Sequence, residues 1–335
     1  MSERRMLANR GWPFDGDRAR EDHGFFGPDS PTWRVWTSPT ALLGFQRSIA
    51  VEAFDPFLTA AVSDTQGIYT DPMGRLDSTL TYFTIVAIGD SRAAIESSEV
   101  LQKVHARATG SEPISGRRYS ANDPDSQLWI HLTGWHSVLK CYEKYGPGPL
   151  SPADEDRYWA DCVIAAELQT CDPATVPTSR DGVRQYFAEQ RPRLCWSENA
   201  DRVARQILYP PYDTTNRLVA LAARRLSPAV IATLPRWMRC LSGLDQSRVT
   251  DAAIVPAMKA AMASTRPLPI RLRLADIVAP SIRPVWENAL RGRPPLRDEI
   301  VTPSEARQRY GSAAIRDIAR AKRNAAHTGP AQTGS

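Results

Sequence analysis

The sequence predicts an all-α fold of roughly ten helices in one large domain. Ser or Asp followed directly by Pro recurs along the chain, which is typical of a helix N-terminus. Apolar residues at helical spacing follow these starts. Hydrophobic residues make up 42% and charged residues 24% of the 335 residues, enough apolar surface for a sizeable core.

Four segments follow from shifts in pattern along the chain. Residues 1–36 are predicted to form an extended arm, residues 37–265 the helical domain, residues 266–322 a C-terminal helical extension, and residues 323–335 a disordered tail. The aromatic residues of the arm are expected to dock on the helical domain; they are Trp12, Phe14, Phe25, Phe26 and Trp33.

The first helices are predicted from caps and apolar runs. Ser38, followed by Pro39, is expected to cap a buried helix that is kinked at Pro56. The segment 76–88 is rich in β-branched and aromatic residues, but its length and its helical neighbours favour a helix.

The later helices are predicted in the same way. Asp90 caps a helix that ends at Gly110, and Asp123 caps one that ends at Gly146. Further helix starts are expected at Ser151, Ser179, Ser197, Ser227 and Ser247. Residues 266–278 alternate like a strand but have no strand to pair with, and residues 307–323 are predicted to form a basic helix with a solvated face.

Charge and cysteine usage narrow the function classes. Lys and Arg number 42 against 37 Asp and Glu, and the two signs are interspersed, which gives no nucleic-acid footprint. The five cysteines form no CxxC pair and are expected to be buried, reduced thiols. No signal peptide or membrane-spanning stretch is found, so a cytoplasmic protein acting on a small molecule is expected.

Three of the five histidines are candidates for chemistry, because His23 and His327 lie in the arm and the tail. His105 faces inward with the apolar side of its helix. On the next helix, His131 lies within the arc formed by the apolar and aromatic residues, whereas His136 lies outside it.

A buried imidazole has two explanations. It either finds an internal hydrogen-bond partner or binds a metal, since burying it unsatisfied is costly. A non-haem metal site needs several ligands at close spacing, whereas haem iron needs one axial imidazole in an apolar slot. If His131 is a ligand, its surroundings therefore favour haem over a non-haem metal.

Several short motifs, taken in order, resemble one known oxygenase family. They are Pro39-Thr-Ala-Leu-Leu-Gly-Phe-Gln-Arg47, Thr70-Asp-Pro-Met-Gly-Arg75, Val104-His-Ala-Arg-Ala-Thr-Gly110, Tyr119-Ser-Ala-Asn-Asp-Pro124 and Trp129-Ile-His131. Over residues 33–245 the chain resembles the family of mycophenolate-pathway oxygenases and latex-clearing proteins, the latter being rubber oxygenases.

This resemblance implies a globin-like helical core and a haem b whose iron has a histidine axial ligand. Carried onto this chain, it makes His131 the metal ligand and His105 a second pocket histidine. It also implies that Arg47 and Arg75 bind the haem propionates, as buried arginines pair well with carboxylates. The alternative for each is a structural contact to a carboxylate or to the backbone. Trp129 and Trp135 are expected beside the haem.

The oxygen side of the haem is less securely placed by the resemblance. Arg107 and Lys103 are the nearest candidates for it, and with His105 they would act in catalysis. Tyr119 and Asp123 also match a family motif, in which Asp123 is expected to cap the helix that carries His131.

The leading hypothesis is a haem b-dependent oxygenase that uses dioxygen on a hydrophobic small molecule, for example an unsaturated one. The alternatives are a non-catalytic protein that binds haem or a lipid-like ligand, and an enzyme of metal-independent chemistry, because a family does not fix a function. A homodimer is compatible with the sequence.

Overall fold

The computed structural model describes residues 18–312, and helices dominate this part of the chain, as predicted. It contains sixteen α-helices: α2 (Pro31–Trp36), α3 (Ala41–Glu52), α4 (Pro56–Thr65), α5 (Gly67–Thr70), α6 (Pro72–Ile88), α7 (Ser91–His105), α8 (Pro124–Tyr145), α9 (Pro152–Ala166), α10 (Arg180–Gln190), α11 (Glu198–Leu208), α12 (Arg217–Ile231), α13 (Arg236–Ser242), α14 (Arg248–Ser264), α15 (Leu268–Val278), α16 (Arg283–Leu290) and α17 (Pro303–Tyr310). Many of them are short, which explains why the sequence predicted only about ten.

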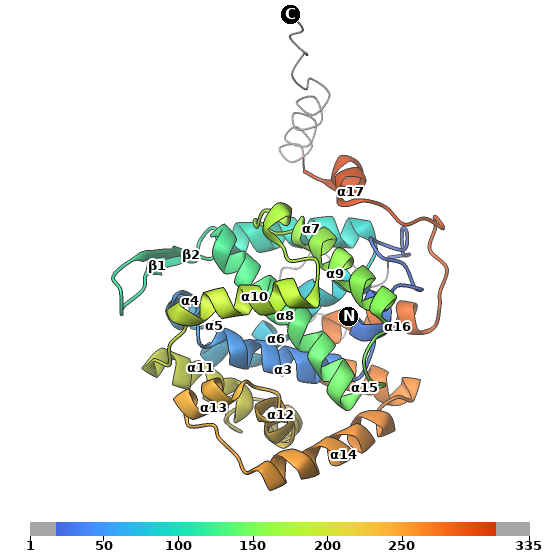
Figure 1. Ribbon diagram of the computed structural model, residues 1–335. Coiled ribbons are helices and arrows are strands. Elements are labelled where there is room, and N and C mark those ends of the chain that lie inside the picture. Colours follow the sequence, from blue (N-terminus) through green and yellow to red (C-terminus); the bar gives the residue numbers. More distant parts are fainter. Residues whose placement is uncertain (1–17, 313–335) are drawn as a thin grey trace, which may run out of the picture.

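The strands of the described residues form a single small hairpin. Strand β1 (Thr109–Ser111) pairs antiparallel with β2 (Arg118–Ser120), so that Gly110 lies opposite Tyr119. The hairpin projects from the side of the helical body (Figure 1). It replaces the last turn predicted for the preceding helix, because α7 ends at His105 instead of near Gly110.

Most of the predicted helix starts are confirmed by side-chain caps. A carboxylate or hydroxyl oxygen accepts a hydrogen bond from a backbone N–H of the first turn at Asp90, Asp123, Ser151, Ser179, Ser197 and Ser247. Asp123 therefore caps α8, as predicted from the sequence.

Two predicted starts are wrong. Helix α3 begins after Thr40 and not after Ser38, whose hydroxyl lies 2.8 Å from the Thr40 hydroxyl. Ser227 and Pro228 lie inside α12, where the Ser227 hydroxyl donates to the Leu208 carbonyl at 2.6 Å. Instead of a kink at Pro56, the chain ends α3 at Glu52 and starts α4 with Asp55 as the cap.

The ends of the described chain also differ from expectation. Part of the predicted extended arm is helical, because Ser30 caps α2. Its aromatic residues Phe25, Phe26 and Trp33 are buried against the body, which confirms the expected docking, whereas Trp12 and Phe14 lie outside the described residues.

The alternating segment 266–278 forms helix α15 over most of its length. Residues 313–335, with most of the predicted basic helix, also lie outside the described part.

The longest helix, α8, runs through the centre of the body (Figure 1). It packs more extensively against α3 than any other two elements pack together. Its aromatic face, which includes Trp129 and Trp135, joins the main hydrophobic core. Helices α12, α13 and α14 lie together at the lower end of the view in Figure 1.

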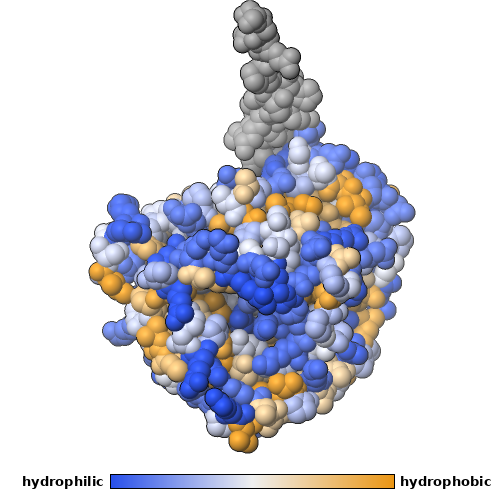
Figure 2. All heavy atoms as spheres, in the orientation of Figure 1, coloured by the Kyte–Doolittle hydropathy of each residue, from blue (hydrophilic) through white to orange (hydrophobic). Residues whose placement is uncertain are grey.

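The surface in Figure 2 is mixed, with hydrophilic residues across the middle of the face and hydrophobic residues in scattered groups. None of the helices within residues 18–312 has both the length and the apolar character to cross a membrane.

Of the five free cysteines, Cys141, Cys162 and Cys171 are buried, whereas Cys240 is exposed, unlike the prediction.

The close contact between α3 and α8 depends on Gly44. A Cβ atom added there would lie 2.6 Å from the Cα of Val138, and a backbone atom does not rotate away. We expect Gly44→Ala to lower the free energy of unfolding by about 1–3 kcal/mol, measured by urea denaturation. Gly67→Ala is the control, because nothing lies within 4 Å of an added Cβ there; equal stability of the two variants would contradict this packing.

Candidate functional site

A large cavity lies between α3, α6 and α8, and its walls also include residues of α4, α7, α11, α12, α14 and α15. Its volume is about 520 Å³, within the range typical of small-molecule and cofactor sites. Most of the lining is apolar, with Leu42, Phe45, Leu76, Leu80 and Ile130 among its residues. The cavity can therefore hold an apolar molecule of moderate size.

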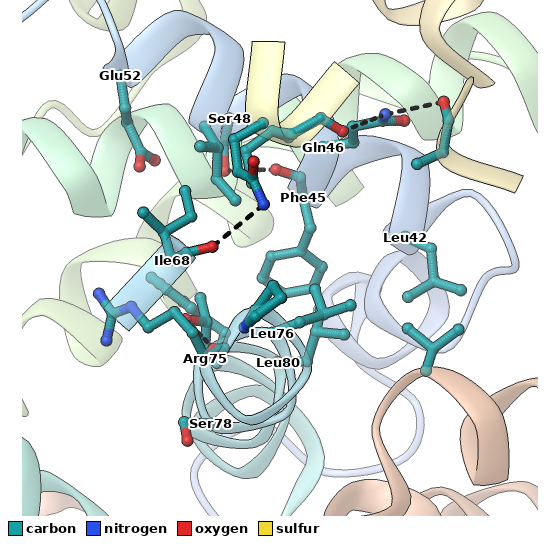
Figure 3. Close-up of a pocket in the computed structure, with 18 of the residues that line it drawn as sticks. Leu42, Phe45, Gln46, Ser48, Glu52, Ile68, Arg75, Leu76, Ser78 and Leu80 are labelled. Atoms are coloured by element: carbon teal, nitrogen blue, oxygen red, sulfur yellow. Dashed lines mark hydrogen bonds between the residues drawn. The ribbon is translucent and has the colours of Figure 1, made fainter. Parts of the chain in front are cut away.

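Ionisable residues also line this cavity, and three of them come from the ends of three different helices. They are Glu52 at the end of α3, Arg75 in the first turn of α6, and His105 at the end of α7. Figure 3 shows Glu52 and Arg75 toward one side of the cavity and Leu42 toward the other. The site thus has a charged region and an apolar region.

Glu52 is held in a poorly hydrated position. Its Oε1 accepts a hydrogen bond of 2.8 Å from the Thr133 hydroxyl of α8. Burial raises the pKa of Glu52 to about 7, although the Thr133 and Ser48 hydroxyls and the positive charge of Arg75 act in the opposite direction. The carboxyl group can therefore change its protonation state near neutral pH.

Arg75 has no close partner for its positive charge. Within residues 18–312, its guanidinium makes no hydrogen bond and no ion pair with a carboxylate. Loss of hydration lowers the pKa of Arg75, and the more distant Glu52 only partly opposes this effect. Arg75 also carries substantial accessible surface. Since the group is nevertheless desolvated, we assign this surface to the cavity.

His105 is fixed by Gln127 of α8. The Gln127 side-chain nitrogen lies 3.1 Å from His105 Nδ1 and 2.5 Å from the Ala121 carbonyl oxygen. A carbonyl only accepts, so the amide nitrogen stands there and donates to Nδ1, which leaves the proton on Nε2. Burial, with a smaller effect of Arg75, lowers the pKa of His105 to about 4, so the ring is neutral at pH 7.

His131 lies in the core and does not line the cavity. Its Nε2 is 2.8 Å from the Cys162 carbonyl oxygen and its Nδ1 is 3.2 Å from the side-chain nitrogen of Gln169. Burial lowers the pKa of His131 to about 4, so the neutral ring donates from Nε2 and accepts at Nδ1. Gln169 lines the cavity and donates to Nδ1 of His131, so this side chain separates the acceptor nitrogen of His131 from the cavity.

The other predicted site residues also lie away from the cavity. Arg47 is buried between α3 and α8, where it donates to the Ser137 hydroxyl at 2.6 Å and to the Thr233 hydroxyl at 3.0 Å. Trp129 and Trp135 are buried in the core, and Arg107 and Lys103 are exposed. Of the predicted site residues, the structure brings His105 and Arg75 together at the cavity.

Sequence reasoning missed Glu52, Gln127 and Gln169, all of which line the cavity. A signal existed for Glu52, a carboxylate directly after the apolar run of α3. The two glutamines gave no signal, because only the packing of α7, α8 and α9 places them beside the histidines.

No group of three or more His, Cys, Asp or Glu side chains suited to hold a metal ion occurs among the described residues. A haem does not need such a group, because a single axial imidazole can hold its iron.

Comparison with known proteins gives one family. The model of the family described as "ER-bound oxygenase mpaB/B'/Rubber oxygenase, catalytic domain" matches residues 33–267. This range contains Glu52, Arg75, His105 and His131. No curated protein and no solved structure matches the chain significantly.

Proposed function

Because the chain belongs to the family of mpaB-type and rubber oxygenase catalytic domains, we propose that it is a haem b-dependent oxygenase acting on a hydrophobic small molecule. Family membership supports oxygenase activity in general. The observation that carries the finer proposal is the cavity of about 520 Å³, apolar along most of its wall and charged in one region. Dioxygen is the co-substrate, and unsaturated molecules fall within the proposed substrate class.

The residues of the cavity fit a haem. The apolar side chains suit the porphyrin ring, and His105 places a single imidazole in the same wall, which is what haem iron requires. Haem, when bound, would supply the activation of dioxygen. The residues of this chain would bind and orient the substrate and keep water out of the cavity, which protects reactive species from side reactions.

Of the two histidines predicted at the haem, we favour His105 over His131 as the residue that would hold its iron. His105 lines the cavity, and its Nε2 makes no hydrogen bond to a described residue. Coordination by this atom requires its proton to move to Nδ1 and the Gln127 amide to turn its oxygen toward the ring. An axial role for His131 would require Gln169 to leave Nδ1.

Glu52 is the residue best suited to hold or release a proton near the substrate. Its pKa of about 7, raised by burial, allows both states at neutral pH. The hydrogen bond from Thr133 fixes the orientation of its carboxyl group.

The second candidate is a non-catalytic protein that binds haem or a lipid-like ligand in the same cavity. One observation favours it: neither histidine offers a free acceptor nitrogen to the cavity in the described conformation, because Gln127 and Gln169 occupy these positions. Turnover separates the two candidates.

The test is to load the purified protein with haem and to measure dioxygen uptake with detergent-dispersed polyunsaturated chains, some with and some without a terminal carboxylate. We expect a Soret band, its shift on adding CO to the reduced protein, and dioxygen uptake that depends on the chain. Haem binding and CO binding without any uptake across a panel of such substrates would favour the non-catalytic candidate. Failure to bind haem at all would contradict the proposal.

A further inference from the structure

We propose that the molecule accepted by this cavity is amphipathic, with a carboxylate bound by Arg75 and an apolar chain lying against the remaining walls. The inference rests on the proposed function and deepens it, because it names the chemical class of the substrate. It also distinguishes such a substrate from a purely hydrocarbon one.

The first step is the unpaired charge of Arg75. A guanidinium removed from water is costly unless a carboxylate or several acceptors receive its N–H groups. No described residue supplies them, since the guanidinium makes no hydrogen bond or ion pair and Glu52 acts only from a greater distance. Its partner is therefore expected to come from a bound molecule, and a planar carboxylate matches its donors in a paired arrangement.

The second step is that the side-chain amide nitrogens of two glutamines at the cavity already have partners. The amide of Gln46 donates to the carbonyls of Ile207 and Ala223, and that of Gln206 donates to the carbonyl of Ile68. Figure 3 shows dashed contacts of this kind beside Gln46 and Ile68. The amide nitrogens are thus occupied by backbone carbonyl oxygens. The arginines of the wall remain as the groups that can bind an anion.

Arg225 is the second arginine of the cavity wall, and it makes no ion pair in the described part of the chain. It lies on α12, away from Glu52 and His105 in the sequence, and it is exposed. Loss of hydration lowers the pKa of Arg75, so this guanidinium calls for a partner. We therefore assign the carboxylate to Arg75 and test Arg225 beside it.

The third step is the apolar remainder of the wall. Leu42 and Phe45 of α3, Leu76 and Leu80 of α6, and Ile130 of α8 line the same cavity as Arg75. A chain of methylene or isoprene units binds more tightly when it moves from water onto such an apolar surface. The combination of the Arg75 guanidinium with an apolar wall fits a long-chain carboxylate better than a small polar acid.

The test compares two probes of equal chain length, dodecanoate and dodecanol, by isothermal titration calorimetry on the haem-loaded protein without dioxygen. We expect dodecanoate to bind at least about tenfold more tightly, as a charge-assisted hydrogen-bond pair allows. In Arg75→Met this preference should disappear, while the affinity for dodecanol changes less than about twofold. Arg75→Gln is the second variant if the methionine protein folds poorly.

Two matched controls accompany these variants. Arg184→Met changes an exposed arginine of α10 that pairs with Asp181, and it should keep the full preference for dodecanoate. Arg225→Met changes the other arginine of the wall. A preference lost in Arg225→Met and retained in Arg75→Met would overturn the assignment, as would equal affinity of the wild-type protein for both probes.

The same titrations on haem-free protein separate the two sources of a carboxylate. If Arg75 binds the substrate, the preference for dodecanoate is present with and without haem. If Arg75 instead binds a haem propionate, the preference disappears on loading with haem, which would overturn the proposal. Because no turnover is involved, a protein with the preference and without dioxygen uptake would contradict the proposed oxygenase activity alone.

The pH dependence of dodecanoate binding is an independent test of the proposal. Near Arg75, Glu52 is the group that titrates around neutrality, His105 stays neutral above about pH 5, and Asp55 pairs with Arg193 at 3.1 Å. Ionised Glu52 competes with the ligand for Arg75, so dodecanoate should bind more weakly at pH 8 than at pH 6. Glu52→Gln should remove most of this difference; a stronger binding of dodecanoate at pH 8 would contradict the arrangement.

Discussion

Replacing His131 with alanine is expected to lower the free energy of unfolding by about 2–4 kcal/mol. The change removes the partners of the Cys162 carbonyl and the Gln169 amide and leaves a void in a region where His131 is only 1% exposed. His105→Ala should cost less than about 1 kcal/mol, because its ring borders the cavity and Gln127 keeps its bond to Ala121. Urea denaturation of the haem-free proteins measures both.

The comparison separates a core histidine from a site histidine. Both variants carry the same chemical change, so each is the control of the other. A His131→Ala protein with wild-type stability would contradict the hydrogen bonding described for this residue. If that stable protein also lost haem, the axial role predicted for His131 from the sequence would be favoured.

Glu52→Gln is expected to change how stability depends on pH. Burial raises the pKa of Glu52 to about 7 in the folded protein, against about 4.3 in an unfolded chain. The folded state therefore binds the proton more tightly, so the contribution of Glu52 to stability is full below about pH 4 and is lost as pH rises to about 7. Between pH 4 and pH 8 the variant should gain up to about 3 kcal/mol relative to the wild type.

The measurement is a series of urea titrations across this pH range. Glu189→Gln is the matched control, because Glu189 is an exposed residue of α10. Its stability relative to the wild type should not change with pH by more than about 0.5 kcal/mol. A Glu52→Gln protein that lost stability relative to the wild type between pH 4 and pH 8 would show that Glu52 is better stabilised in its charged form.

The helical class and most helix starts could be predicted because their causes are local. A serine or aspartate cap acts on the next three residues, so Asp90 or Ser151 can be recognised without knowing the fold. Where a tertiary contact decides, the prediction failed: the Ser227 hydroxyl bonds to Leu208 of another helix, which allows α12 to continue through Pro228.

The candidate site was harder to predict, and the helix α8 shows why. The sequence placed His131 correctly on the apolar side of this helix, but that side faces the core and α9. The cavity borders another side of α8, which carries Gln127 and Ile130. An apolar arc identifies a buried face of a helix, and it does not tell a filled core from an open cavity.

The sequence motifs predicted His105 and Arg75 as site residues, but they did not predict a role for Glu52. Its raised pKa depends on burial beside Thr133, a residue 81 positions away. Such long-range proximity follows from the packing of α3 on α8, and the apolar run before Glu52 signals only that the residue follows a buried helix face.

The most direct test of the central claim, that the cavity beside His105 holds the haem, is the Soret spectrum of three proteins loaded with haem under equal conditions. The wild type and His131→Ala, each measured per folded molecule, should give the same band and the same shift with CO in the reduced state. His105→Ala should lose the band or show one displaced toward that of unligated haem, and added imidazole should restore it. A wild-type spectrum in His105→Ala, together with its loss in folded His131→Ala, would contradict this account.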